Sequence, residues 1–317
     1  SMAAIGTMMI PTMTERGYPK RFVVAVTAAG AVLGPIIPPS IIMIIYGSIM
    51  GVSIGAMFAG GIIPGLLITA IMLLLNRYFA GVYDLPKLEK KYSLREVWLA
   101  FRKAFLPMLT PLIILGGIFS GVFTPTEAAA VAVLYSVILT CFLLKTLKLR
   151  ELPQLIINCG NTIGAVLLLV SAAAALSWFL TITRTPTTFG EFLMGITSNP
   201  QALMIILVVL VLAAGTILDT MGGGLVLCPA ILPPMIAAGA DPIHVGIVVS
   251  IGFSLGTVTP PFGFVLYVAS SISNEKPEQV AKANFPYLSL QVAALFLIAL
   301  VPEISLLLPR LMGFIME

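Results

Sequence analysis

Charge and reactive side chains are scarce in this sequence. Only 9% of its 317 residues are charged, and it has 3 cysteines and 1 histidine. Cys141, Cys159 and Cys228 stand singly in apolar surroundings without metal-ligand spacing, so we expect ordinary small core residues. The sequence lacks a His-Glu-x-x-His motif, a nucleophile elbow and a pair of intramembrane carboxylates spaced for acid–base work. Zinc binding, redox chemistry and enzymatic activity are therefore not indicated.

Apolar residues, in contrast, make up 59% of the chain, and the mean hydropathy is +1.09. This composition is typical of residues solvated by lipid. The predicted fold class is therefore an all-α, multi-pass membrane protein, in which a spanning helix needs about 20 apolar residues. The apolar runs lie near 22–50, 54–80, 105–120, 124–144, 155–181, 201–218, 225–238, 243–272 and 285–308.

The basic residues predict how the chain is oriented in the membrane. They give a net charge of +4 and lie in short loops between apolar runs, which indicates topology and not nucleic-acid binding. If the loop with Lys20 is cytoplasmic, alternating crossings bring almost every other basic residue to the same side. The exceptions are Arg184 and Arg310. We expect the amphipathic linker at 84–104 to lie along the inner interface.

Residues 10–64 recur in weakened form 222 positions later. Among the matched positions are four prolines, where about one is expected by chance at an average composition. The loop at Gly17 is predicted to be cytoplasmic and the matched loop at Gly239 to be external, so the repeats are predicted to be inverted, as in alternating-access transporters. The matched pairs are Pro11/Pro233, Gly17/Gly239, Gly30/Gly252, Leu33/Leu255, Gly34/Gly256, Pro38/Pro260, Pro39/Pro261 and Pro64/Pro286.

The repeat also predicts a domain organisation. Residues 1–64 form the first repeat, 65–200 the connecting helices, 201–286 the second repeat and 287–317 a C-terminal helix. Residues 203–231 of the second copy would need partners before residue 1. We therefore expect a fragment or processed chain that lacks its first hairpin arm, without a signal peptide at its start.

In both repeats a Gly-x-x-x-Pro-Pro run, at 34–39 and 256–261, interrupts an apolar stretch. The paired prolines lack N–H groups, so several carbonyls lose their helical partners, which is costly in hydrocarbon. A bound cation could take up these carbonyls, and the half-helix that restarts beyond each break points its positive end toward an anion. A structural Pro kink is the alternative, but the duplication favours paired broken helices that form a transport site.

The apolar runs 201–218 and 225–238 are short for spanning helices and predict a re-entrant hairpin with a glycine-rich tip at 219–224. Asp219 in that tip is a carboxylate at membrane depth, which suggests a functional role. With Thr220 it could complete a cation site at the second break. The alternative is that Asp219 caps a helix in an ordinary loop.

Two further polar residues have structural interpretations. Glu127 follows Thr124 at the spacing of a capping box, with proline at the first helical position. His244 stands alone at a helix start and is expected to be a polar surface residue, although a role in proton movement stays open.

Five stretches carry a family resemblance. They are Gly-x-x-x-Pro-Pro-Ser at 34–40, Gly-Val-Phe-Thr-Pro-Thr-Glu-Ala-Ala-Ala-Val-Ala-Val at 121–133, the glycine-rich tip at Asp219, Asp-Pro-x-His-x-Gly at 241–246 and Gly-x-x-Thr-Pro-Pro-x-Gly at 256–263. Together they resemble the large membrane subunit of tripartite ATP-independent periplasmic (TRAP) transporters over essentially the whole chain. The earlier helices and first hairpin tip of that family are not seen here.

The resemblance implies an elevator-type symporter in the bacterial inner membrane that imports an organic acid with sodium. Sialic acid and C4-dicarboxylates are both family substrates. The implied partners are a small membrane (Q) subunit and a periplasmic substrate-binding (P) protein, and no cofactor is implied beyond sodium as the coupling ion. A membrane scaffold subunit with a purely architectural repeat is the alternative.

These interpretations define the candidate site residues. Arg184 is the predicted carboxylate-binding charge, with an interfacial snorkelling arginine as its alternative. The predicted substrate-binding residues are Arg184, Ser40, Thr220 and Pro261. The predicted sodium ligands are Gly34, Ile37, Pro38, Ser40, Asp219, Thr220, Gly222, Gly256, Thr257 and Thr259.

Overall fold

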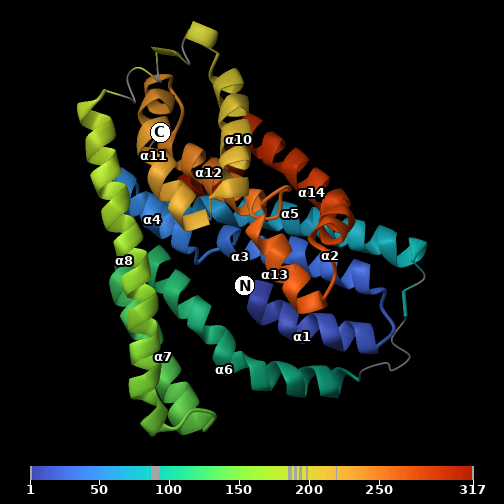
Figure 1. Ribbon diagram of the computed structural model, residues 1–317. Helices are drawn as coiled ribbons and strands as arrows, with labels where there is room; N and C mark the ends of the chain where they lie inside the picture. The colour runs from blue at the N-terminus through green and yellow to red at the C-terminus, as the bar shows by residue number, and fades with distance from the viewer. Residues whose placement is uncertain are drawn as a thin grey trace. The chain divides into compact units, whose positions relative to one another are not determined.

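The structure is a computed structural model that describes residues 2–83, 85–86, 93–184, 188, 191–192, 195–197, 199–218 and 220–315. All regular secondary structure in these residues is helical (Figure 1). Seven helices in the described part of the chain are long and apolar enough to cross a membrane. The predicted all-α, multi-pass class is therefore confirmed.

The chain divides into two compact units, each with its own internal packing. The first contains Ser1–Pro86 and Ala173–Glu317, and the second contains Lys87–Ala172. We call them the repeat unit and the connecting unit. The helix α8 (Leu152–Ile182) belongs to both.

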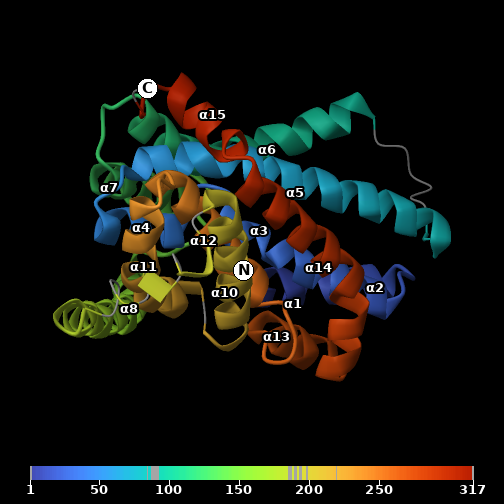
Figure 2. The ribbon, with the colours of Figure 1, turned by 90° about the horizontal axis from the view of Figure 1, so that it is seen from above.

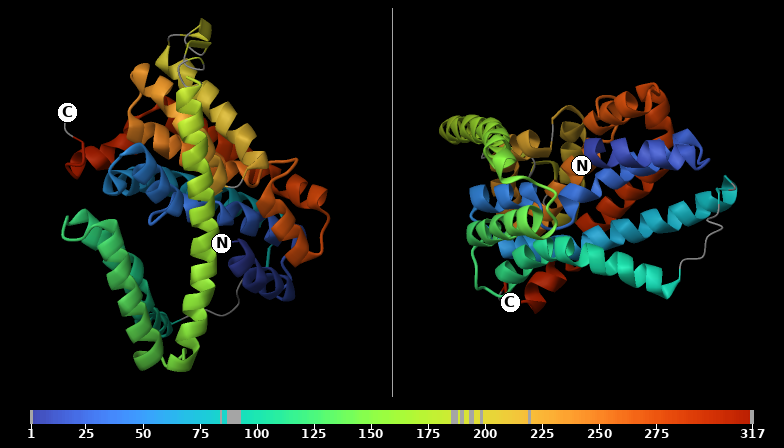
Figure 3. Two further views of the ribbon diagram at one scale, coloured as in Figure 1. Left: turned by 60° about the vertical axis from the view of Figure 1, so that its left-hand side comes forward. Right: turned by 90° about the horizontal axis from the view of Figure 1, so that it is seen from below.

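The connecting unit is built on α6 (Leu94–Phe119) and α7 (Pro125–Ile138), which pack against each other (Figure 3). A π-helix at Leu139–Leu143 continues α7, and a short 3₁₀ helix at Leu149–Glu151 precedes α8. In α7, the Thr124 N–H donates to Glu127 Oε2 at 2.8 Å, and the Glu127 N–H donates to Thr124 Oγ1 at 3.3 Å. The predicted capping box of Glu127 is confirmed. Because α6 is unbroken, the described part of the predicted interfacial linker joins the next apolar run in one helix.

The repeat unit contains both copies of the repeat. The helices of the first copy are α1 (Met2–Glu15), α2 (Lys20–Ala31), α3 (Leu33–Ile36), α4 (Ile41–Met50) and α5 (Ile54–Val82). The helices of the second are α10 (Pro200–Ile217), α11 (Thr220–Ala237), α12 (Pro242–Gly256), α13 (Phe264–Ser273) and α14 (Pro277–Leu300), followed by α15 (Glu303–Leu311). The predicted boundaries at 64 and 286 stay predictions, and α5 and α14 continue through these residues.

The helix boundaries of the two copies match at the offset read from the sequence. The helix α2 begins at Lys20 and α12 at Pro242, and 20 + 222 = 242. The turns before them also match, since Gly17 and Gly239 have φ of 86° and 90°. Glycine adopts this left-handed backbone without the steric cost of a Cβ atom. The repeated glycine therefore fixes the same reversal of the chain in both copies.

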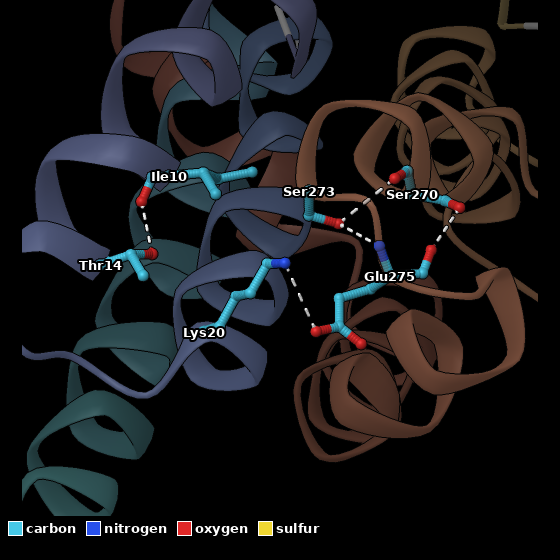
Figure 4. A network of polar contacts seen from close by, with 6 residues as sticks. All are labelled: Ile10, Thr14, Lys20, Ser270, Ser273 and Glu275. Carbon is cyan, nitrogen blue, oxygen red and sulfur yellow. Dashed lines mark hydrogen bonds and ion pairs between the residues drawn. The ribbon is translucent and has the colours of Figure 1, made fainter.

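The two copies run in opposite directions along α14. Near the start of α14, Lys20 Nζ lies 3.7 Å from Glu275 Oε1 (Figure 4), and further along, Gln291 Nε2 donates to the Ala29 carbonyl at 3.2 Å. The helix α2 is thus parallel to α14. The start of α12 instead lies near the end of α14, where His244 Nε2 is 3.2 Å from the Ala299 carbonyl. These contacts describe an inverted arrangement.

The helix α12 occupies the centre of the repeat unit, with α10, α11 and α14 around it (Figure 2). Every residue from Ile243 to Gly256 is buried. The hairpin arms contact the opposite copy, since α11 packs on α4 and α1 packs on α13. This exchange joins the two copies into one body.

Two expectations about burial are wrong. His244 is only 3% exposed, with its Nδ1 2.6 Å from Ser305 Oγ, because α14 and α15 cover the start of α12. It is therefore not a surface residue. Of the cysteines expected in the core, Cys228 is buried and Cys141 is half-buried, but Cys159 is exposed on α8. A small apolar side chain facing lipid carries no penalty in a membrane protein, so its apolar sequence context did not imply burial.

Candidate functional site at the paired helix breaks

The first break separates α3 from α4. The Ile37 N–H still donates to the Leu33 carbonyl at 2.8 Å, but Pro38 and Pro39, joined by a cis peptide bond, have no N–H to continue the helix. The Ser40 hydroxyl donates to the Pro35 carbonyl and so takes up one of the freed groups. Gly34, whose i+4 partner is Pro38, has no backbone donor at that position.

The second break follows Gly256 and contains the cis Pro260–Pro261 bond. The Thr257 hydroxyl donates to the Ser254 carbonyl at 2.6 Å, and the Thr259 hydroxyl donates to Leu255 at 2.8 Å. Each hydroxyl oxygen keeps lone pairs that can accept a hydrogen bond or bind a cation. The break therefore presents hard oxygen atoms of the kind that small cations prefer.

The hairpin brings its tip to the second break. A Cβ atom added to Gly256 would lie 2.5 Å from backbone atoms of Gly215, so the ends of α10 and α12 meet in backbone contact. A Cβ atom added to Gly223 would lie 2.3 Å from the Phe253 ring. The glycines of the tip thus allow close packing. The residues Thr220–Gly224 are helical, so most of the glycine-rich stretch predicted to form the tip at 219–224 lies within α11.

The same hairpin reaches the first break. A Cβ atom on Gly224 would be 3.5 Å from Ile42 Cδ1, two residues after Ser40. The helix α12 contacts both α3 and α4, and α5 supports the break, since a Cβ on Gly61 would lie 3.1 Å from the Ile36 carbonyl. The two breaks and the hairpin tip therefore converge in one region of the repeat unit.

The predicted site residues differ in accessibility. Pro38, Ser40, Gly256 and Thr257 are buried, Thr220, Gly222 and Thr259 are half-buried, and Gly34, Ile37 and Pro261 are exposed. Asp219 lies outside the described residues, between the ends of α10 and α11. Each break thus combines a buried hydroxyl with an exposed stretch of backbone. The roles of these residues as ligands stay predictions.

Arg184 follows α8 and is exposed, with a positive φ of 54°. Its carbonyl accepts hydrogen bonds from the backbone and hydroxyl of Thr188, at 3.0 and 3.2 Å. These hydrogen bonds involve only its backbone carbonyl. The role of the Arg184 side chain in binding a carboxylate stays a prediction.

The sequence interpretation missed Gly215 and Phe253, which set the approach of the hairpin to the second break. A signal was available in the small residues Ala213, Ala214 and Gly215, because small residues mark close helix crossings in membrane proteins.

Inverted broken helices that converge with a hairpin, together with the seven candidate membrane spans among the described residues, define a multi-pass membrane transporter fold. Residues 1–304 match the family pattern of the tripartite ATP-independent periplasmic transporter, DctM component. The chain belongs to this family. Its predicted membership of the TRAP large permeases is confirmed. Its named relatives are transporter permeases and not enzymes.

Three relatives illustrate the match. The isethionate TRAP transporter permease protein DctMQ of Oleidesulfovibrio alaskensis is 35% identical over 306 residues, which are 96% of this chain and 48% of the relative. The C4-dicarboxylate large permease DctM of Rhodobacter capsulatus is 32% identical, over 99% of this chain and 74% of the relative. The sialic acid large permease SiaM of Vibrio cholerae is 36% identical, over 97% and 72%. The chain thus spans about half of the first relative and nearly three quarters of the others.

Proposed function

We propose that this chain is the transporting part of a sodium-driven importer of organic acid anions in the bacterial inner membrane. The observation that carries the proposal is the convergence of both helix breaks with the hairpin tip. Family membership supports the transporter class. The carbonyl and hydroxyl oxygen atoms at the breaks support sodium as the coupling ion.

The sodium sites would use backbone carbonyls and hydroxyls. Gly34 with Ser40 at the first break, and Thr257 with Thr259 at the second, offer the oxygen ligands of a small hard cation. Asp219 between the hairpin arms would add the one full negative charge that favours a cation there. Each of the two breaks would provide one cation site within a single transport site.

The anion would bind where the half-helices restart. The helix α4 begins after Ser40 and α13 after Gly263, and neither N-cap residue makes a side-chain capping bond. The first N–H groups of α4 are therefore available to an anion, which the helix dipole also favours. At the start of α13 the Val265 N–H already donates to the Thr257 carbonyl at 2.9 Å, so that helix offers fewer free groups. The names of the relatives, which include a sulfonate, dicarboxylates and sialic acid, support an organic acid as the substrate.

The inverted arrangement suits an elevator-type alternating-access mechanism. We assign the movement to the repeat unit, because both breaks and the hairpin lie within it. A periplasmic binding protein would deliver the acid, and the small Q subunit would complete the membrane complex. The fused name of the DctMQ relative supports that second partner.

Uptake by proteoliposomes tests the proposal directly. The chain with its small subunit and binding protein should accumulate acid only with sodium, with a dependence steeper than first order when more than one ion is coupled. A panel of sialic acid and C4-dicarboxylates would identify the substrate. Equal uptake with potassium or choline, across a range of pH, would contradict sodium coupling.

The competing function is a membrane scaffold. A scaffold would show no uptake of any acid and no sodium-dependent rise in thermal stability, whereas a transporter bound to sodium is stabilised by mass action. A thermal unfolding series in sodium and potassium chloride separates the two.

A further inference from the structure

A cavity of about 650 Å³ lies in the repeat unit where α2 and α14 begin, and none of its lining residues belongs to either break. Residues of α2, of the end of α5, and of the start of α14 line it. It lies at the end of the unit where Lys20, at the start of α2, meets Glu275 in the loop before α14 (Figure 4). The distribution of basic residues assigns this end to the cytoplasm.

The charge around the cavity is unbalanced. Lys20, Arg21 and Lys282 contribute three positive charges, and Glu275 contributes the one negative charge among the lining residues. Glu275 is engaged by Lys20 at 3.7 Å. Its backbone is held in turn, because Ser270 Oγ donates to the Glu275 carbonyl at 2.6 Å. In the described part of the chain, Arg21 and Lys282 have no ion-pair partner, so two positive charges face the cavity uncompensated.

The other wall of the cavity is aromatic. The Phe79 ring lies 6.4 Å from Phe22, 5.6 Å from Tyr83 and 5.7 Å from Tyr287, measured between centroids. These rings form a connected apolar surface beside the charges. The cavity therefore suits a molecule with an anionic head and an apolar body.

The start of α2 adds to the positive potential, because Pro19 before it makes no side-chain capping bond. The start of α14 adds little, since Pro277 has no N–H, the Gln279 N–H donates to the Lys276 carbonyl, and Glu278 is acidic. At the matched position of the second copy, Asp241 caps α12 by accepting from the Ile243 N–H at 2.8 Å. The first copy thus leaves open to an anion the helix end that the second copy closes with a carboxylate.

We propose that this cavity binds the phosphate headgroup of an anionic phospholipid from the cytoplasmic leaflet. Arg21 and Lys282 contact the phosphate, and the aromatic wall packs against the glycerol and the first acyl carbons. Basic pockets between helices on the cytoplasmic side are a known type of lipid-headgroup site. The aromatic wall favours a lipid over free phosphate, which has no apolar part.

Titration of phosphatidylglycerol into the purified full chain, followed by native mass spectrometry, tests the site against phosphatidylcholine as the neutral lipid. The Arg21→Gln/Lys282→Gln variant should lower phosphatidylglycerol affinity by roughly 30-fold and leave phosphatidylcholine unchanged. The Arg21→Lys/Lys282→Arg variant keeps the charge and should retain most of the binding.

A charge-matched control is Arg95→Gln/Lys103→Gln on α6, which removes the same charge from the connecting unit and should bind as the parent does. Equal loss in both Gln variants would show a non-specific effect of net charge and overturn the site. Competition by millimolar inorganic phosphate at the parent cavity, with no preference for phosphatidylglycerol, would assign it to a soluble phosphate and overturn the lipid proposal.

Discussion

The two repeats share their backbone turns and differ in the side chains that complete them. At the turns, Gly17 and Gly239 have nearly the same φ, and at the breaks both proline pairs end a half-helix. At the first break the hydroxyl follows the prolines, at Ser40. At the second the hydroxyls precede them, at Thr257 and Thr259.

The starts of the matched helices α2 and α12 also differ. The start of α2 carries Lys20 and Arg21 beside a cavity of about 650 Å³, whereas the start of α12 lies beside a cavity of about 310 Å³, is capped by Asp241 and carries the buried His244. Glycine and proline therefore determine the common architecture, and the polar side chains give each copy its own chemistry.

The largest effect on stability is expected where backbone meets backbone in the second copy. In Gly256→Ala the new Cβ lies 2.5 Å from Gly215, which cannot move aside as a flexible side chain could. We expect a destabilisation of about 3 kcal/mol and a fall in uptake of at least tenfold, measured by thermal unfolding and proteoliposome transport. Gly81→Ala on α5, where a Cβ meets nothing within 4 Å, is the control. Similar stability of both variants would contradict the close contact.

The two aspartates of the second copy should separate ion binding from helix capping. Asp219→Asn is expected to reduce uptake by about 100-fold with near-normal expression, because it removes the charge proposed to bind sodium. Asp241→Asn should keep the capping bonds and retain uptake within about threefold. Full activity of Asp219→Asn with unchanged sodium dependence would return Asp219 to the role of a helix cap.

The hydroxyls test whether each break contributes a sodium ligand. Ser40→Ala and Thr259→Val should each raise the sodium concentration for half-maximal uptake by about tenfold, since one oxygen ligand is lost. Thr69→Val is matched, because its hydroxyl also donates to a carbonyl four residues earlier, at 2.7 Å, but in α5. If only one of the two substitutions raised the sodium concentration for half-maximal uptake, sodium would be bound by a hydroxyl in that repeat alone.

The smallest effect on stability is expected at the buried His244 near the start of α12. Ser305→Ala removes the hydroxyl 2.6 Å from His244 Nδ1 and should cost about 1 kcal/mol of stability without changing sodium dependence. Ser289→Ala removes an exposed hydroxyl on α14 that donates to Pro286 and should cost less than about 0.5 kcal/mol. Equal melting temperatures of the two variants would contradict a stabilising role for the contact between Ser305 and His244.

The sequence predicted the features that depend on local backbone chemistry. Missing N–H groups located both breaks, the repeated glycines located the turns, and the spacing of Thr124 and Glu127 located a capping box. Each follows from residues close together in the chain. The repeat offset then related distant segments without knowledge of their packing.

Features that depend on packing between distant helices were not predictable in this way. The burial of His244 requires α14 and α15, and the contact of Gly215 with Gly256 requires the α10–α12 crossing. The tip glycines suggested irregular backbone, but they serve as contact surfaces inside α11. Glycine allows both, and only the neighbouring Phe253 ring distinguishes them.

State-dependent accessibility of the hairpin tip is the most direct test of the central claim that the tip and both breaks form one sodium-coupled site. Thr216 is the position to label, because it is half-buried at the end of α10 and is not a predicted ligand, whereas a cysteine at Gly223 would clash with Phe253. Thr216→Cys, in a background without Cys141, Cys159 and Cys228, should react with an impermeant thiol reagent several-fold more slowly in sodium than in potassium. Equal reaction rates in the two salts, with and without substrate, would contradict the claim.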